Sequence, residues 1–357
     1  MSERAGKSTG AQWFPADWPD RIRAHARGDL VPVPPRRAAT VLLLREAPDG
    51  PGGLLVHMLR RRASMAFAAG AYAYPGGGVD PRDSETAVRW AGPSPAAWAE
   101  RLGLDEEGAA RAVVCAAVRE TFEECGVLLA GPDAETVVAD VSGPEWEAER
   151  AALVAHETSF AAFLNRHALV LRSDLLGGWA RWITPEFEAR RYDTWFFVAA
   201  LPEGQRTREV STEADRTEWV RPVDALHRYA EGALQMMPPT VATLRDLVPY
   251  GSVPGVMADL EGRALKPVLA EARLDGDEVV LTWPGHEEFT RRVPGGGPGG
   301  LSGGSPGGGS PGGGSPGGGS SGEGSPGGGL QGGGAPGEGA PGEGAPGEGS
   351  VGGGEGA

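Results

Sequence analysis

Short apolar runs separated by turn-forming residues make up most of the chain before its C-terminal tail. The runs 38–45 and 54–60 flank a turn rich in Pro and Gly, a pattern that predicts a β-hairpin. The run 193–201 predicts a buried strand that follows a turn at 182–188, and a further short strand is predicted at 218–223.

The clearest helical pattern covers 111–125, and Gly126 stands where glycine commonly follows the last helical residue. At about 100° per residue, the apolar side chains of this segment share one face and its glutamates the other. Four further helical stretches are predicted, at 95–102, within 143–165, at 225–231 and at 239–247. Strands mixed with helices in this way predict an α/β sandwich.

Composition divides the chain into four parts, an N-terminal extension (1–36), a main domain (37–250), a C-terminal extension (251–293) and a tail (294–357). The N-terminal extension is polar and Pro-rich, with Trp13 and Trp18 as candidate anchors onto the main domain. The tail consists almost entirely of Gly, Pro, Ser, Ala and Glu. We predict that it is disordered, because this composition cannot offset the entropy lost on ordering.

The charge balance limits the choice of partners. The net charge is −15, of which the tail glutamates contribute five. No basic cluster stands out beyond Arg60–Arg62, so we expect no nucleic-acid partner, because such binding depends on neutralising phosphates. A small anionic substrate remains compatible if a metal ion supplies local positive charge.

Two cysteines, Cys115 and Cys125, fall on one predicted helix, about 15 Å apart along its axis and too far for a disulfide. The N-terminus lacks an apolar signal core, and no run of about 18 apolar residues occurs. We therefore expect a cytoplasmic protein without a membrane partner. The oligomeric state does not follow from the sequence.

Candidate chemistry is concentrated in the segment RETFEECGV at 119–127. Glu120, Glu123 and Glu124 are spaced i, i+3 and i+4, so they share one helix face and repel one another. A divalent cation would relieve this repulsion, and oxygen ligands favour Mg²⁺ or Mn²⁺ over zinc. The alternative is a solvated acidic face with Arg119 as a local ion-pair partner.

The segment 119–127 resembles the second half of the Nudix box, whose pattern is G-x5-E-x7-R-E-U-x-E-E-x-G-U, with U a bulky apolar residue. Thr121 stands at the first U of that half. Gly77–Asp83, preceded by Pro75-Gly76, resembles the first half, and Asp83 stands where the family usually has Glu. The resemblance implies a Nudix-type α/β/α sandwich with a mixed β-sheet and inserted helices.

An insertion separates the two halves of the box. Asp83 and Arg119 have 35 residues between them where the pattern has seven, so 28 additional residues lie near 84–112. This is similar to a subgroup of coenzyme A diphosphatase-like Nudix members. Three other segments also resemble that subgroup, at 184–185, 190–194 and 237–240. Ala66 departs from it, because members that hydrolyse coenzyme A usually have Arg at this position.

The resemblance also implies roles for individual residues. Glu120, Glu123 and Glu124 would bind the metal, with Glu120 or a neighbouring carboxylate as general base, and Arg119 would orient the glutamates. Two further candidates are metal ligands: the carboxylate of Glu213, with Glu209 and Glu218 as rivals, and the backbone carbonyl of Gly77. Arg61 and Arg191 are candidates for contacts with substrate phosphates. The alternative for Glu213 is a solvated loop glutamate, and for Gly77 an ordinary tight turn. The alternative for the two arginines is a place at the surface or in packing contacts.

These observations predict a metal-dependent Nudix hydrolase that cleaves a diphosphate linkage in a small nucleoside diphosphate-linked substrate by attack of water on phosphorus. Coenzyme A or acyl-coenzyme A is the favoured substrate, followed by nucleotide sugars and dinucleotides. A Nudix-fold module that senses a nucleotide without cleaving it is the main alternative, and the intact glutamates argue against it. An isomerase on the same fold is a weaker one.

Overall fold

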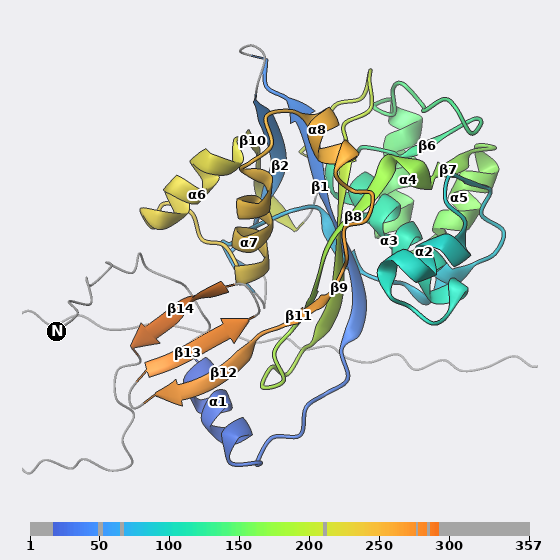
Figure 1. Cartoon of the computed structure of the whole chain (residues 1–357). Coiled ribbons are helices and arrows are strands. Elements are labelled where there is room, and N and C mark those ends of the chain that lie inside the picture. The colour runs from blue at the N-terminus through green and yellow to red at the C-terminus, as the bar shows by residue number, and fades with distance from the viewer. Residues whose placement is uncertain are drawn as a thin grey trace, which may run out of the picture. The chain divides into compact units, whose positions relative to one another are not determined.

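The computed structural model describes residues 17–48, 53–64, 68–209, 213–275, 278–283 and 286–292 (Figure 1). All of these residues belong to one compact unit, Met1–Pro298. Trp13, Ala66 and the predicted disordered tail lie outside the described residues.

A mixed β-sheet forms the centre of the described part of the chain. Its strands run in the order β10-β2-β1-β9-β8-β11, with the short strands β3 (Tyr72–Ala73) on β2 and β4 (Gly76–Gly78) on β1. The bounds of the six ordered strands are β1 Arg36–Glu46, β2 Leu54–Arg61, β8 Leu176–Ile183, β9 Tyr192–Ala200, β10 Ala214–Val220 and β11 Pro267–Leu269. The predicted hairpin is confirmed, because β1 and β2 pair antiparallel with Leu44 opposite Val56.

Strand β1 is buried on both faces, which explains its apolar sequence. It pairs in parallel with β9 from Arg36 opposite Tyr192 to Leu44 opposite Ala200. Because successive strand residues point to opposite faces, Val41 and Leu43 enter one hydrophobic core while Leu42 and Leu44 enter the other. The predicted α/β/α sandwich is therefore confirmed.

Helices cover the two faces of the sheet (Figure 1). One layer contains α2 (Pro95–Leu102), α3 (Glu107–Cys125), α4 (Pro144–Val154) and α5 (Phe160–Arg166), and the other contains α6 (Pro222–Ala230), α7 (Pro238–Leu247) and α8 (Val253–Ala258). Helix α2 has the predicted bounds and begins at the cap residue Ser94, whose hydroxyl accepts a hydrogen bond from the Ala97 amide. Helix α3 begins four residues before the predicted start and ends, as predicted, before Gly126 in the left-handed conformation.

Other sequence predictions were also wrong at their boundaries, including the helix predicted at 225–231, which is α6 at Pro222–Ala230. The predicted turn at 182–188 begins inside β8, and the predicted strand at 218–223 ends at Val220, after which Pro222 begins α6. Strand β8 escaped prediction because its Gly177 and Gly178 carry no hydrophobic signal. A Cβ atom at Gly177 would lie 2.0 Å from a methyl group of Leu260, so a side chain there would displace Leu260 of the C-terminal extension.

Both extensions contain secondary structure that the sequence pattern did not predict. Helix α1 (Trp18–Ala26) anchors the N-terminal one, since Trp18 is buried edge-on against Phe187 with ring centroids 5.2 Å apart. In the C-terminal extension, α8 and β11 are followed by a three-stranded sheet, whose strands are β12 (Glu271–Asp275), β13 (Glu278–Trp283) and β14 (His286–Arg292).

A second small sheet lies within the inserted and helical regions. It pairs β5 (Trp90–Ala91) and β6 (Ala130–Gly131) with β7 (Val170–Arg172). Among the described residues, no helix is long and apolar enough to cross a membrane.

Candidate active site

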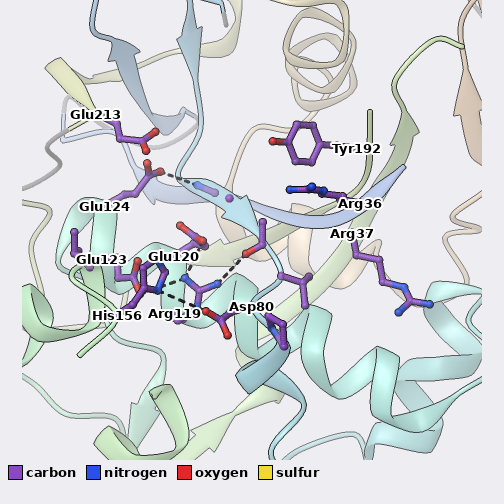
Figure 2. Close-up of a pocket in the computed structure, with 16 residues that line it drawn as sticks. Arg36, Arg37, Asp80, Arg119, Glu120, Glu123, Glu124, His156, Tyr192 and Glu213 are labelled. Atoms are coloured by element: carbon purple, nitrogen blue, oxygen red, sulfur yellow. Dashed lines mark hydrogen bonds and ion pairs between the residues drawn. The ribbon is translucent and has the colours of Figure 1, made fainter. Parts of the chain in front are cut away.

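The glycine strand β4 lies directly against the glutamate face of α3, whose side chains Glu120, Glu123 and Glu124 are shown in Figure 2. The Gly76 amide donates a 2.8 Å hydrogen bond to the Glu124 carboxylate. A Cβ atom at Gly77 would lie 2.4 Å from Oε1 of Glu120, closer than real Cβ contacts allow. A side chain at this position would therefore displace the Glu120 carboxylate, and glycine lets the two predicted motif halves meet without that displacement.

The guanidinium of Arg119 connects both halves of the site. It donates two hydrogen bonds of 3.0 Å to the carboxylate of Asp83 and one of 2.9 Å to the Gly78 carbonyl. It also donates to Glu120 at 2.8 Å and to Glu123 at 3.2 Å. Arg119 is 6% exposed, so its planar group holds these carboxylates in a largely buried arrangement.

Burial dominates the electrostatics of the glutamates. It raises the pKa of Glu120 to about 7, although the charge of Arg119 acts in the opposite direction. Burial also raises the pKa of Glu123 and, together with the charge of Glu120, raises that of Glu124 well above its ordinary value. The ionised forms are therefore destabilised without a compensating cation, and an all-oxygen donor set suits Mg²⁺ or Mn²⁺.

These glutamates face a cavity of about 460 Å³. The cavity is lined by the glycine strand, the acidic face of α3 and residues from five other parts of the chain: Arg36–Arg37, Val79–Pro81, Val154 and His156, Tyr192, and Glu213. Within the described ranges, no three acidic, histidine or cysteine side chains converge closely enough to form a ready-made metal cluster. Their oxygens are held instead by Arg119 and the Gly76 amide.

Of the three loop carboxylates considered, Glu213 lines the cavity. It lies near Glu124, whose pKa its charge raises, and its carboxylate is 3.7 Å from the guanidinium of Arg61. Glu218 pairs instead with Arg228 at 2.9 Å, and Glu209 is exposed and accepts a long hydrogen bond from Thr217. The structure thus brings Glu213 to the predicted carboxylates and places its two rivals elsewhere.

The two arginines predicted to contact phosphates are not among the cavity-lining residues. Arg61 ends β2 beside Glu213 and is close enough to lower the pKa of Glu124 through its charge. Arg191 is 8% exposed and donates to the carbonyls of Thr184 and Val33 at 3.0 and 2.9 Å, so it fastens the segment before β1 to the β8–β9 connection. Contacts of either arginine with substrate stay a prediction.

Comparison with known proteins supports this arrangement. The family model described as NUDT19 Nudix domain matches residues 35–247, which include β4, Asp83 and all of α3. The chain belongs to the NUDT19 Nudix domain family. The predicted resemblance to the Nudix family is therefore confirmed.

Relatives of this NUDT19 Nudix domain share much of its length. The acyl-coenzyme A diphosphatase NUDT19 of Gallus gallus is 28% identical over 311 residues, covering 71% of this chain and 79% of the relative. The human protein of the same name is 26% identical over 304 residues, covering 71% and 80%. A crystal structure of a Nudix hydrolase from Alicyclobacillus acidocaldarius, 28% identical, aligns with a TM-score of 0.55 and covers 66% of this chain and 99% of that one.

Five polar cavity residues of this Nudix domain were missed by sequence reasoning: Arg36, Arg37, Asp80, His156 and Tyr192. Arg36 and Arg37 carried a usable signal, because two basic residues directly precede an apolar strand. His156 could not be found from spacing. It has a positive φ of 57° at the end of α4 and lies in the cavity because its Nδ1 and carbonyl contact Arg82.

Proposed function

We propose that this chain is a Mg²⁺- or Mn²⁺-dependent Nudix diphosphatase that hydrolyses coenzyme A or acyl-coenzyme A. The observation that carries the proposal is the set of three glutamates on α3, two buried and one 12% exposed, held against the glycine strand by Arg119 and the Gly76 amide. Relatives named acyl-coenzyme A diphosphatase, similar over most of their length, support the substrate class.

Glu120, Glu123 and Glu124 would hold the divalent cation, with Glu213 as a further ligand from the loop before β10 and the Gly77 carbonyl as a backbone ligand. A cation bound there supplies positive charge that attracts the diphosphate oxygens and makes phosphorus more electrophilic. Arg119 positions the glutamates, since its guanidinium donates to two of them and to Asp83.

The carboxylate of Glu120, or of a neighbouring glutamate, accepts a proton from the attacking water. The water oxygen forms a bond to phosphorus while the bond from that phosphorus to the bridging oxygen breaks, and the bridging oxygen leaves on the other phosphate. For coenzyme A, the products are an adenosine bisphosphate and phosphopantetheine. The cavity is accessible to such a substrate, because its lining includes the exposed residues Arg36, Arg37 and His156.

The test is release of a phosphorylated product from coenzyme A, an acyl-coenzyme A, ADP-ribose and a nucleotide sugar, with Mg²⁺ or Mn²⁺ and with EDTA. We expect cation-dependent cleavage of the coenzyme A compounds and a large loss in Glu123→Gln. Glu203→Gln, which removes an exposed carboxylate outside the cavity, serves as the control. Tight binding of one compound without cleavage of any would support the nucleotide-sensing alternative instead.

A further inference from the structure

The cavity has a cationic end that faces away from the glutamates. Arg36 begins β1 and Tyr192 begins the parallel strand β9, and the two residues are partners in the strand register. Both line the cavity, and Figure 2 shows their side chains extending into it from the side opposite Glu124 and Glu213. Arg37, the next residue, turns its guanidinium in another direction, as alternation along a strand requires.

Arg36 differs from Arg119 in what surrounds its charge. All donor groups of Arg119 that face the site are engaged by Asp83, Gly78 and the glutamates. The side chain of Arg36 is exposed and has no hydrogen-bond or ion-pair partner among the residues that the structure describes. Its backbone is fixed nonetheless, because its amide donates a 2.8 Å hydrogen bond to the carbonyl of Arg191.

The Tyr192 side chain has the same combination of a fixed backbone and a free polar end. Its amide donates to the Thr184 hydroxyl at 3.0 Å, while its own hydroxyl has no partner within the described ranges. A guanidinium and a phenol hydroxyl therefore lie together as uncommitted donors at one end of a cavity whose other end is acidic. Donors of this kind match phosphate oxygens.

We propose that Arg36 and Tyr192 form a phosphate-binding subsite that fixes the substrate in the cavity. The inference rests on the proposed diphosphatase function, because the glutamates and their cation would hold the reacting diphosphate from the opposite side. The phosphate that Arg36 binds is either the outer part of the diphosphate itself or the additional phosphate on the ribose of coenzyme A. Both have the same chemistry, and the choice of substrate separates them.

The experiment compares the parent with Arg36→Gln, Arg36→Lys and Tyr192→Phe on coenzyme A and on 3′-dephospho-coenzyme A. We expect kcat/KM of Arg36→Gln to fall about 10- to 100-fold, the range of a charge-assisted hydrogen bond. A loss on both compounds assigns Arg36 to the diphosphate, and a loss on coenzyme A alone assigns it to the ribose phosphate. Arg36→Lys should retain part of the activity, and Tyr192→Phe should lose less than Arg36→Gln.

Arg190→Gln is the matched control, since it removes the same charge from an exposed position two residues before Tyr192 and outside the cavity lining. Equal kcat/KM values for Arg36→Gln and this control on both compounds would overturn the subsite. If the parent cleaves neither compound, the proposed function fails, and the subsite is then tested by calorimetric binding of coenzyme A, which carries both phosphate groups, with Mg²⁺. Binding that is weakened in Arg36→Gln but not in the control supports the subsite, whereas equal binding or no binding at all overturns it.

Discussion

Arg119 and Asp83 form a two-hydrogen-bond ion pair, with both distances 3.0 Å, although 35 residues separate them in the chain. The intervening segment leaves the sheet, forms α2 and returns as the first turns of α3. Both partners are buried, at 6% and 3% exposure. The insertion is therefore accommodated outside the pair, and a long loop costs little because closure entropy rises slowly with length.

This pair gives the first prediction. Asp83→Asn weakens two hydrogen bonds of the buried Arg119 guanidinium, which keeps its ion pairs with Glu120 and Glu123, so we expect unfolding stability to fall by about 1.5 to 3 kcal/mol. Asp174→Asn is the control, because it breaks a similar two-bond pair with Arg172 whose carboxylate is 34% exposed, and should cost about 1 kcal/mol or less. Denaturant unfolding measures both, and equal losses would show that burial of the Asp83 pair does not matter.

The second prediction concerns the glycine strand. Gly77→Ala would place a methyl group 2.4 Å from Glu120, so the carboxylate must move, and a displacement of about 1 Å can lower kcat on the order of 100-fold. Gly78→Ala is the matched control, since nothing lies within 4 Å of an added Cβ atom there. Steady-state kinetics with the coenzyme A compounds checks both variants, and equal kcat values would contradict the close-approach argument.

The third prediction separates stability from function at Glu124. Burial and the charge of Glu120 raise its pKa well above the ordinary value, so the carboxylate opposes folding when no cation is present. In EDTA, Glu124→Gln should unfold at the same temperature as the parent or higher, because the amide oxygen of the glutamine can still accept a hydrogen bond from the Gly76 amide.

Added Mn²⁺ should raise the Tm of the parent more than that of Glu124→Gln, since only the parent retains all three glutamates. Identical Mn²⁺ shifts in calorimetry would remove Glu124 from the metal-ligand assignment.

The fourth prediction is a pH dependence of stability from His57. This residue is 1% exposed in β2 and packs against Trp219, and neither ring nitrogen has a hydrogen-bond partner among the described residues. Burial first, and the charge of Arg45 second, lower its pKa from 6.5 to about 4. Between these values the unfolded chain binds the proton more readily, so stability falls as the pH drops from about 6.5 towards 4, by up to about 3 kcal/mol.

His57→Phe tests this dependence because it preserves an aromatic ring against Trp219 and removes the titrating group. Denaturant unfolding at several pH values should show a shallower loss of stability below pH 6.5 in the variant than in the parent. An unchanged slope would assign the acid sensitivity to other groups.

Local sequence patterns were sufficient to predict an element where its burial in the structure follows the periodicity of its apolar residues. The bounds of α2, the hairpin of β1 and β2, the C-terminal end of α3 and the shared face of the three glutamates all follow from short-range rules. Strand β8 did not follow from them, because its two glycines are selected by contact with Leu260 and Leu265 from the C-terminal extension. Contacts of that range leave no periodic signal in the sequence of the strand.

The sequence by itself determined the acidic helix, the glycine turn and their family. The tertiary structure decided which distant residues join them. Parallel pairing of β1 with β9 places Arg36 beside Tyr192, and the end of α4 brings His156 to the same cavity. Because the inserted segment returns to the site at α3, the guanidinium of Arg119 can donate to the carboxylate of Asp83. Helix and turn propensities act over a few residues, whereas these positions depend on sheet register and on the packing of elements far apart in the chain.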